Sequence, residues 1–378
     1  MTSRRKSSVA IVAVVLAIFA GLALWAVSRS GGERASGGGA ESRSDQPGTT
    51  DAVETGDRAA AAGGDAGTPA QMATPPDTVA PPRASEPTRV VVRAEWGGGS
   101  GQLGRDRPQE ANPEAPMSLT TAADGTVLVL DQVNGRITRF GPDGRPLDPI
   151  RLGVDTPQDL ALGGDGTIAV LDRLVSRRVA ILSPDGREVG SLPLEGEGVP
   201  ETGGVTGVFV DGEDVYVERE NGPLVRIGDV EGAEGDRAEV PGRPTRDGLS
   251  WIMAGLVEPL AGRFFVNSIA RPSREHRYTR DIAVPMSLRQ ILLLDTDRSG
   301  IIYVAVAGTP YGASEEVEEV RLLCLAPADG TTIGFAVLPP NLDPDETLRE
   351  MTVLDGGGVL YAMRSDEGVT IGLFDCRG

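Results

Sequence analysis

Apolar and polar positions alternate in short runs along most of the chain after residue 89, and two of these runs repeat each other. Leu119–Asp131 and Leu160–Asp172 each contain two apolar segments separated by Asp-Gly. Asp-Gly supplies the positive φ of a tight hairpin turn, so each run predicts two antiparallel strands. The second run follows the first by 41 residues, the spacing between Pro116 and Pro157.

Each predicted hairpin is followed by a third strand and another turn. The turns at 141–144 and 183–186 have Pro in second place, which presets φ, and Gly in fourth place. Hairpins that recur about every forty residues are typical of a β-propeller. Further hairpins are expected at 208–218, 256–269, 291–306 and 351–363.

Six hairpins indicate an all-β fold, a six-bladed β-propeller over residues 89–378. The last predicted blade contains only three strands, because the chain stops soon after the strand at 369–374. A valine-rich strand at 89–96 precedes all the other blades. We expect this N-terminal strand to complete the last blade and close the ring, which removes exposed strand edges.

The first two repeats resemble the NHL family within the TolB-like class of six-bladed propellers. The residues that carry the resemblance are Pro116, Asp124-Gly125, Val129-Leu130-Asp131, Asn134-Gly135-Arg136-Ile137 and Phe140, partly echoed by Pro157, Asp165-Gly166, Leu171-Asp172 and Arg178-Val179. The match covers residues 95–195 well and the rest weakly. It implies a propeller used for ligand or protein binding, and such motifs specify the fold far more than the function.

Residues 9–27 are uncharged and mostly apolar, and as a helix they would span about 28 Å, close to a bilayer core. We predict a transmembrane signal-anchor. The basic residues within 1–8 place this tail in the cytoplasm and the body on the periplasmic or extracellular side. A cleaved signal peptide is the alternative, because Ala26-Val27-Ser28 resembles a cleavage site.

Residues 28–88 contain no Ile, Leu, Phe, Tyr or Trp and are rich in Gly, Ala, Ser, Thr and Pro. Such a segment cannot bury enough apolar surface to fold, so it is expected to be a disordered linker. Charges balance over residues 1–89, and the net charge of −19 therefore belongs to the propeller. A body this acidic repels a phosphate backbone, which argues against nucleic acid as a partner.

Carboxylates recur where second strands end, at Asp131, Asp172 and Glu218. Repetition at equivalent places favours a structural role, in which the carboxylate accepts hydrogen bonds from the backbone of the next turn. Calcium in the central channel is the alternative, and it would need six to eight oxygen ligands from several blades. His276 is the only histidine, which excludes zinc enzymes with several histidine ligands. No cofactor is predicted.

A basic group stands out on this acidic body: Arg271, Arg274, Arg277, Tyr278 and Arg280. We expect it on an exposed loop, where guanidinium groups bind a small anionic ligand or a carboxylate-rich partner, or are simply solvated. Cys324 and Cys376 are the only cysteines. Outside the cytoplasm a disulfide is allowed, provided that their Cα atoms lie within about 7 Å.

The sequence as a whole favours a membrane-tethered, extracytoplasmic propeller that binds a ligand or a protein, or serves as a scaffold, and is not an enzyme. The alternative is a metal-dependent enzyme of lactonase or lyase type that uses acidic channel residues. A purely structural envelope protein is a third option. Carboxylates and amides of at least three blades that converge on one point would favour the enzyme.

Overall fold

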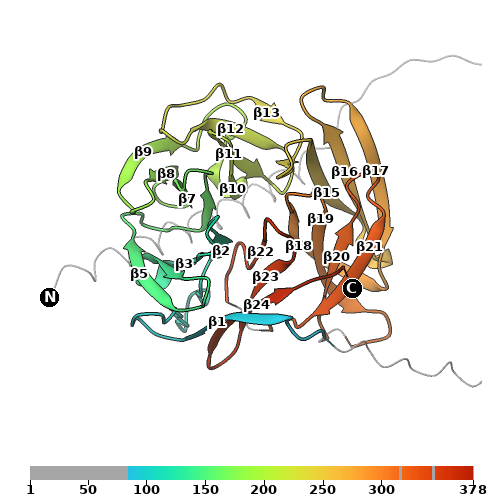
Figure 1. Ribbon diagram of the computed structural model, residues 1–378, viewed down its shortest axis with the longest axis horizontal. Coiled ribbons are helices and arrows are strands. Elements are labelled where there is room, and N and C mark those ends of the chain that lie inside the picture. Colours follow the sequence, from blue (N-terminus) through green and yellow to red (C-terminus); the bar gives the residue numbers. More distant parts are fainter. Residues whose placement is uncertain (1–83, 315–316, 343–344, 378) are drawn as a thin grey trace, which may run out of the picture. The chain divides into compact units, whose positions relative to one another are not determined.

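The computed structural model describes residues 84–314, 317–342 and 345–377, all within the compact unit Pro76–Gly378. These residues form six four-stranded antiparallel sheets, the blades of a propeller, arranged around a central channel (Figure 1). The predicted cytoplasmic tail, signal-anchor and most of the linker lie outside the described residues. Within the described ranges no helix is long and apolar enough to cross a membrane.

The first three blades follow one another in sequence. Within each blade the strands are given from the channel outward. Blade 1 contains β2 (Ser118–Thr121), β3 (Val127–Asp131), β4 (Arg136–Phe140) and β5 (Pro146–Arg151). Blade 2 contains β6 (Asp159–Leu162), β7 (Ile168–Asp172), β8 (Arg178–Leu182) and β9 (Glu188–Pro193). Blade 3 contains β10 (Val205–Asp211), β11 (Asp214–Arg219), β12 (Leu224–Asp229) and β13 (Glu239–Val240).

The remaining blades complete the ring. Blade 4 contains β14 (Arg243–Pro244), β15 (Ser250–Glu258), β16 (Arg263–Ala270) and β17 (His276–Ala283). Blade 5 contains β18 (Met286–Thr296), β19 (Ile302–Pro310), β20 (Glu319–Leu325) and β21 (Thr332–Leu338). Blade 6 contains β22 (Met351–Val353), β23 (Val359–Arg364), β24 (Gly368–Phe374) and β1 (Arg89–Glu95). Three short 3₁₀ turns are η1 (Gln132–Asn134), η2 (Thr202–Gly204) and η3 (Pro259–Ala261).

The predicted ring closure is confirmed, since β1 pairs antiparallel with β24 as the outer strand of blade 6. The predicted hairpin turns also form, and Gly125 and Gly166 adopt φ of 85° and 87°. The hairpin predicted at 256–269 also forms, but not as the first two strands of its blade. The segment 256–269 is formed by the second and third strands of blade 4, because the short β14 takes the first position.

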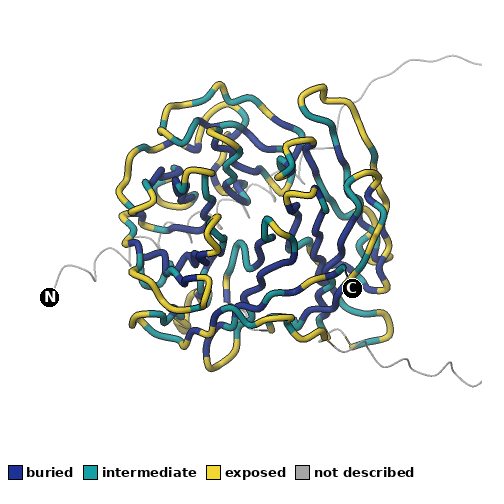
Figure 2. The backbone as a smooth tube through the Cα atoms, viewed as in Figure 1, coloured by how far each residue is buried: buried dark blue, intermediate teal, exposed yellow. Residues whose placement is uncertain are grey.

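Apolar side chains are buried in six clusters, each between two neighbouring blades, and Figure 2 shows the exposed segments mostly along the outer rim of the ring. Side chains alternate across a strand, and here both faces of an inner blade strand are covered. This explains why β3 and β7 are buried along their whole length. The cluster between blades 3 and 4 is much the smallest, with four buried residues against at least eleven in each of the others.

Candidate ligand-binding channel

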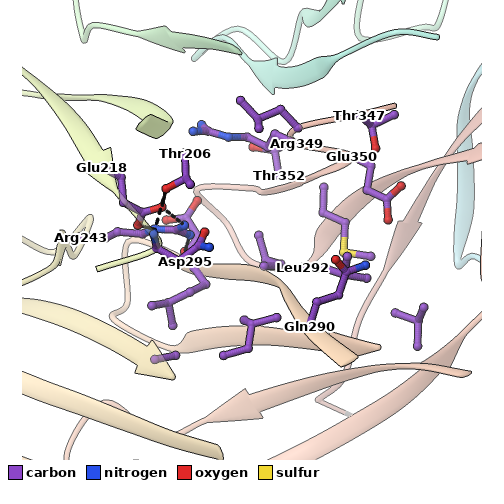
Figure 3. Close-up of a pocket in the computed structure, with 18 of the residues that line it drawn as sticks. Thr206, Glu218, Arg243, Gln290, Leu292, Asp295, Thr347, Arg349, Glu350 and Thr352 are labelled. Atoms are coloured by element: carbon purple, nitrogen blue, oxygen red, sulfur yellow. Dashed lines mark hydrogen bonds and ion pairs between the residues drawn. The ribbon is translucent and has the colours of Figure 1, made fainter. Parts of the chain in front are cut away.

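The central channel contains a cavity of about 970 Å³ (Figure 3). Glu218 of blade 3, Arg243 of blade 4 and residues 345–350 before blade 6 give it a charged wall, whereas residues 252–256 of β15 and 291–294 of β18 give it an apolar wall. Strands within a blade alternate in direction, so all turns between second and third strands lie at one end of the channel, which we call the mouth. The β11–β12 turn at Glu220–Gly222 lines the cavity at this end.

Glu218 and Arg243 form the ion pair at the centre of the charged wall, and Figure 3 shows them joined across blades 3 and 4. Arg243 donates from Nε and Nη2 to the two carboxylate oxygens, at 2.7 and 2.9 Å. Thr206 adds a hydrogen bond of 2.9 Å. Burial alone would raise the pKa of Glu218. The ion pair with Arg243 and the hydrogen bonds outweigh this effect and lower the pKa.

Asp159 joins blades 1, 2 and 3 and the segment before blade 6 through one buried carboxylate. It accepts hydrogen bonds from Ser118 Oγ of blade 1 at 2.6 Å and from the Val208 amide of blade 3 at 3.0 Å. Arg349, which directly precedes blade 6, approaches it from the channel at 2.6 Å. The guanidinium groups of Arg349 and Arg243 each lie 4.9 Å from the ring centre of Phe209. This part of the wall is therefore rigidly tied together.

Further ion pairs lie around the cavity. Far from the mouth, Arg246 contacts Asp295 at 2.6 Å and Asp355 at 3.0 Å, which links blades 4, 5 and 6. On the blade 6 side, Arg364 lies 3.2 Å from Glu350.

Glu350 is a lining carboxylate with a raised pKa. Both Asn341 and Arg364 donate to its Oε2 atom. Burial raises the pKa of Glu350, repulsion from Glu318 adds to the effect, and attraction by Arg364 opposes it. Its side chain points into the cavity in Figure 3. A carboxyl group of this kind can exchange a proton with a bound molecule.

The channel carboxylates face arginines rather than one another. Asp159, Glu218, Asp295 and Glu350 each have a guanidinium partner from another element. Among the described residues, the set of His, Cys, Asp and Glu ligand atoms that gather within 4.8 Å is Cys324, Asp375 and Cys376, and both of its sulfur atoms belong to a disulfide. The convergence of carboxylates expected for a metal-dependent enzyme is not seen in this part of the chain.

The three recurring carboxylates have different surroundings. Asp172 accepts hydrogen bonds from the amides of Leu174 and Val175 in the following turn, and these bonds together with those from Thr156 lower its pKa against the effect of burial. Asp131 accepts from the Gly104 amide and from three nearby side chains. Glu218 holds Arg243 in the cavity. Of the three carboxylates that the sequence pattern grouped together, Asp172 holds its following turn as predicted, Asp131 instead holds the Gly104 backbone, and Glu218 lies in the channel.

The prediction of an exposed loop at 271–280 was wrong for residues 276–280, because His276–Ala283 forms β17. Tyr278 and Arg280 lie two residues apart on one face of β17, and a β-bulge at Arg277 interrupts the alternation of side chains there. Arg277 donates to Ser250 Oγ at 2.6 Å, and Arg271 pairs with Asp211 at 2.7 Å. Arg274 donates to the carbonyl oxygen of Glu239 at 3.2 Å. These contacts distribute the basic group over several partners, and anion binding by it stays a prediction.

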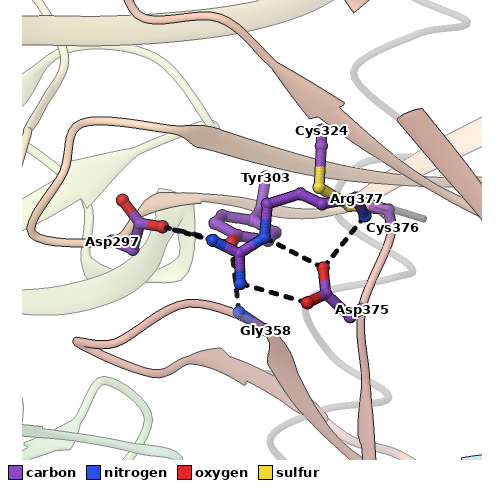
Figure 4. The surroundings of a disulfide bond; sticks show 7 residues. All are labelled: Asp297, Tyr303, Cys324, Gly358, Asp375, Cys376 and Arg377. Carbon is purple, nitrogen blue, oxygen red and sulfur yellow. Dashed lines mark hydrogen bonds and ion pairs between the residues drawn. A yellow bond between two sulfur atoms is a disulfide. The ribbon is translucent and has the colours of Figure 1, made fainter. Parts of the chain in front are cut away.

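Cys324 of β20 and Cys376, just after β24, form a disulfide between blades 5 and 6 (Figure 4). Their Cα atoms lie 5.7 Å apart, inside the limit for such a bond. Beside it, Tyr303 donates to Asp297 and accepts a hydrogen bond from the Gly358 amide, both at 3.1 Å. This second contact also crosses from blade 5 to blade 6, so the two blades are held together at the ring closure.

No known protein family matches the chain, and neither does any curated protein. Among solved structures, it is similar to Kuenenia stuttgartiensis hydrazine synthase (17% identity, 68% of this chain and 78% of that chain, TM-score 0.45). It is also similar to virginiamycin B lyase from Staphylococcus aureus (14%, 71% and 83%, 0.38) and a putative 6-phosphogluconolactonase from Bacteroides uniformis (14%, 74% and 90%, 0.44). At these identities and TM-scores the likenesses carry no argument about function.

Proposed function

We propose that this protein is a membrane-tethered, extracytoplasmic propeller that binds a partner protein at the mouth of its channel. The tether and its orientation rest on the apolar segment 9–27 and the basic residues before it. The disulfide supports an oxidising compartment for the propeller, because disulfides persist outside the cytoplasm.

The observation that carries the proposal is the distribution of exposed large apolar side chains. The described residues include twelve such side chains, and seven of them lie at the mouth, on turns, links and the end of β15: Leu174, Val175, Val257, Leu260, Tyr311, Val317 and Leu342. Four lie on outer strands and one, Leu249, at the opposite end. Leu260 is 84% exposed and Leu342 75% exposed. Apolar side chains that gather at one end, around a cavity, mark a surface that another molecule covers.

Site-specific photo-crosslinking in the cells that make the protein tests this proposal. The full chain would carry benzoylphenylalanine in place of Leu260, with the same substitution at Phe335, an exposed residue of an outer strand, as the matched control. We expect a discrete adduct from position 260 and none from 335. No adduct from 260 or 342, or equal adducts from 260 and 335, would contradict a partner at the mouth.

The metal-dependent enzyme remains the second candidate because Glu350 presents a carboxyl of raised pKa to the cavity. Calcium would have to displace arginines from Glu218, Asp295 and Glu350 before it could bind these lining carboxylates. We therefore expect thermal melting of the protein to be unchanged by calcium. A saturable rise in melting temperature would instead show that the native state binds the ion, and would favour the enzyme.

A further inference from the structure

Blade 4 has an incomplete first strand. β14 contains two residues and pairs with β15 only through Arg243↔Ile252 and Pro244↔Trp251. β15 contains nine residues and pairs along its other edge with β16 as far as Glu258. Among the described residues, therefore, β15 has a strand neighbour from Met253 to Leu256 on the edge that pairs with β16 and none on the edge that faces the channel.

The cavity lining shows that this open edge is accessible. All five residues 252–256 line the cavity, although side chains of a strand alternate between its two faces. Gly255 has no side chain, so only its backbone can contribute to the lining. A run of consecutive lining residues means that the backbone edge of β15 faces the cavity. Such an edge offers N–H and C=O groups to another extended chain.

The surroundings of the edge define the chemistry of a matching occupant. Leu292 and Leu294 of β18 belong to the apolar wall of the same cavity. The lining arginines 243, 246, 289, 349 and 364 are all paired with carboxylates. Two exposed lining acids, Glu220 and Glu346, have no ion pair with any described residue. The site thus favours an extended segment with apolar side chains and basic residues.

We propose that the partner inserts an extended, basic and apolar peptide segment into the channel, where it hydrogen-bonds to the edge Met253–Leu256 and extends the first strand of blade 4. This strand addition rests on the proposed function, since it names the partner's chemistry at the same mouth. Backbone hydrogen bonds would supply affinity, and Glu220 and Glu346 would select positive charge. The exposed Val257 and Leu260 stand at the entry to the edge.

The test uses the full chain and a fluorescent, capped alternating Val-Arg octapeptide, with binding followed by anisotropy. One control peptide has the same sequence with alternate backbone amides methylated, and so has the same charge without the donors for strand pairing. A second control alternates Val and Glu. We expect both controls to bind at least about tenfold more weakly than the Val-Arg peptide. Hydrogen exchange should slow within residues 252–256 when that peptide is bound.

A double substitution of the two acids sharpens the result. Glu220→Gln with Glu346→Gln should weaken the Val-Arg peptide several-fold, whereas Glu197→Gln with Glu201→Gln, exposed acids of another link, should not. Equal binding of the methylated peptide, protection elsewhere in the chain, or no binding up to about 1 mM would each overturn strand addition. If the adduct at position 260 persists in that case, the partner binds the mouth in another way. If strand addition fails and the adduct at position 260 is also absent, the proposed function is contradicted as well.

Discussion

The charged wall of the channel stabilises the propeller through buried charges that have lost their contact with water. The side chain of Glu218 is 2% exposed, and its carboxylate is stabilised by Arg243 and Thr206 instead of solvent. Removing one member of a buried pair leaves the other charge without its partner, which costs more than the pair itself contributes. The ion pair therefore matters for stability as well as for the shape of the cavity.

Glu218→Gln should lower the free energy of unfolding by about 3–5 kcal/mol at neutral pH, because Arg243 loses its counter-charge. The folded pKa of Glu218 is below its ordinary value of 4.5, so its contribution is present above that pH and is lost as the pH falls through the folded pKa. The variant should lack this part of the acid sensitivity. Urea unfolding between pH 3 and 7 measures both effects. Glu220→Gln, two residues away and exposed, is the control, and identical profiles for Glu218→Gln and wild type would contradict the argument.

Sequence reasoning missed Asp159 and Arg349, although one signal was present. Ser118 and Asp159 occupy equivalent positions in the first two repeats, 41 residues apart, and the structure joins them by a hydrogen bond. A buried Asp at the start of an apolar strand needs hydrogen-bond donors to compensate for its loss of water. Its principal partner, Arg349, lies 190 residues away in sequence and outside any recognisable repeat, so only the closed ring brings the two together.

The ring closure was predictable at the level of elements, whereas the incomplete blade was not. The sequence contains a valine-rich strand before the first blade and a last blade with only three strands. Pairing these two segments removes the exposed edge of each, and β1 pairs with β24 in this way. The short β14 has no such signal, because Arg243-Pro244 is preceded by Pro241-Gly242 and contains no apolar alternation. Gly242 lies so close to β15 that a Cβ atom on residue 242 would be 2.3 Å from the carbonyl oxygen of Ile252.

β17 was expected to be a loop because its sequence is polar on both faces. In the structure it is an outer strand whose residues are mostly exposed, and its pairing with β16 supplies what the sequence pattern lacks. Strand propensity is weak where one edge and most side chains of a segment are exposed to water. Pairing with a neighbouring strand then determines whether the segment forms a strand. Outer strands of blades are thus the elements least visible in the sequence.

The ring as a whole is stabilised by packing between blades, and its smallest cluster lies beside the proposed binding edge. Blades 3 and 4 share four buried residues, among them Trp251 at the base of β15. Blades 5 and 6, on another side of the ring, share the largest cluster and the disulfide. Binding surfaces are usually found in the less stable parts of a fold, and this asymmetry places the open edge of β15 at the seam with least packing.

The disulfide contributes to the stability of the whole ring because it closes a long loop between two blades. Cys324 and Cys376 are separated by 52 residues, for which the chain-entropy model gives about 4 kcal/mol. Replacing both by Ser should therefore lower the free energy of unfolding by about 2–5 kcal/mol. Urea unfolding of wild type with reductant should approach the same value, and reductant should leave the double variant unchanged. If reductant and substitution both have no effect, packing and the Tyr303 hydrogen bonds alone hold blades 5 and 6 together, and the disulfide no longer supports an oxidising compartment.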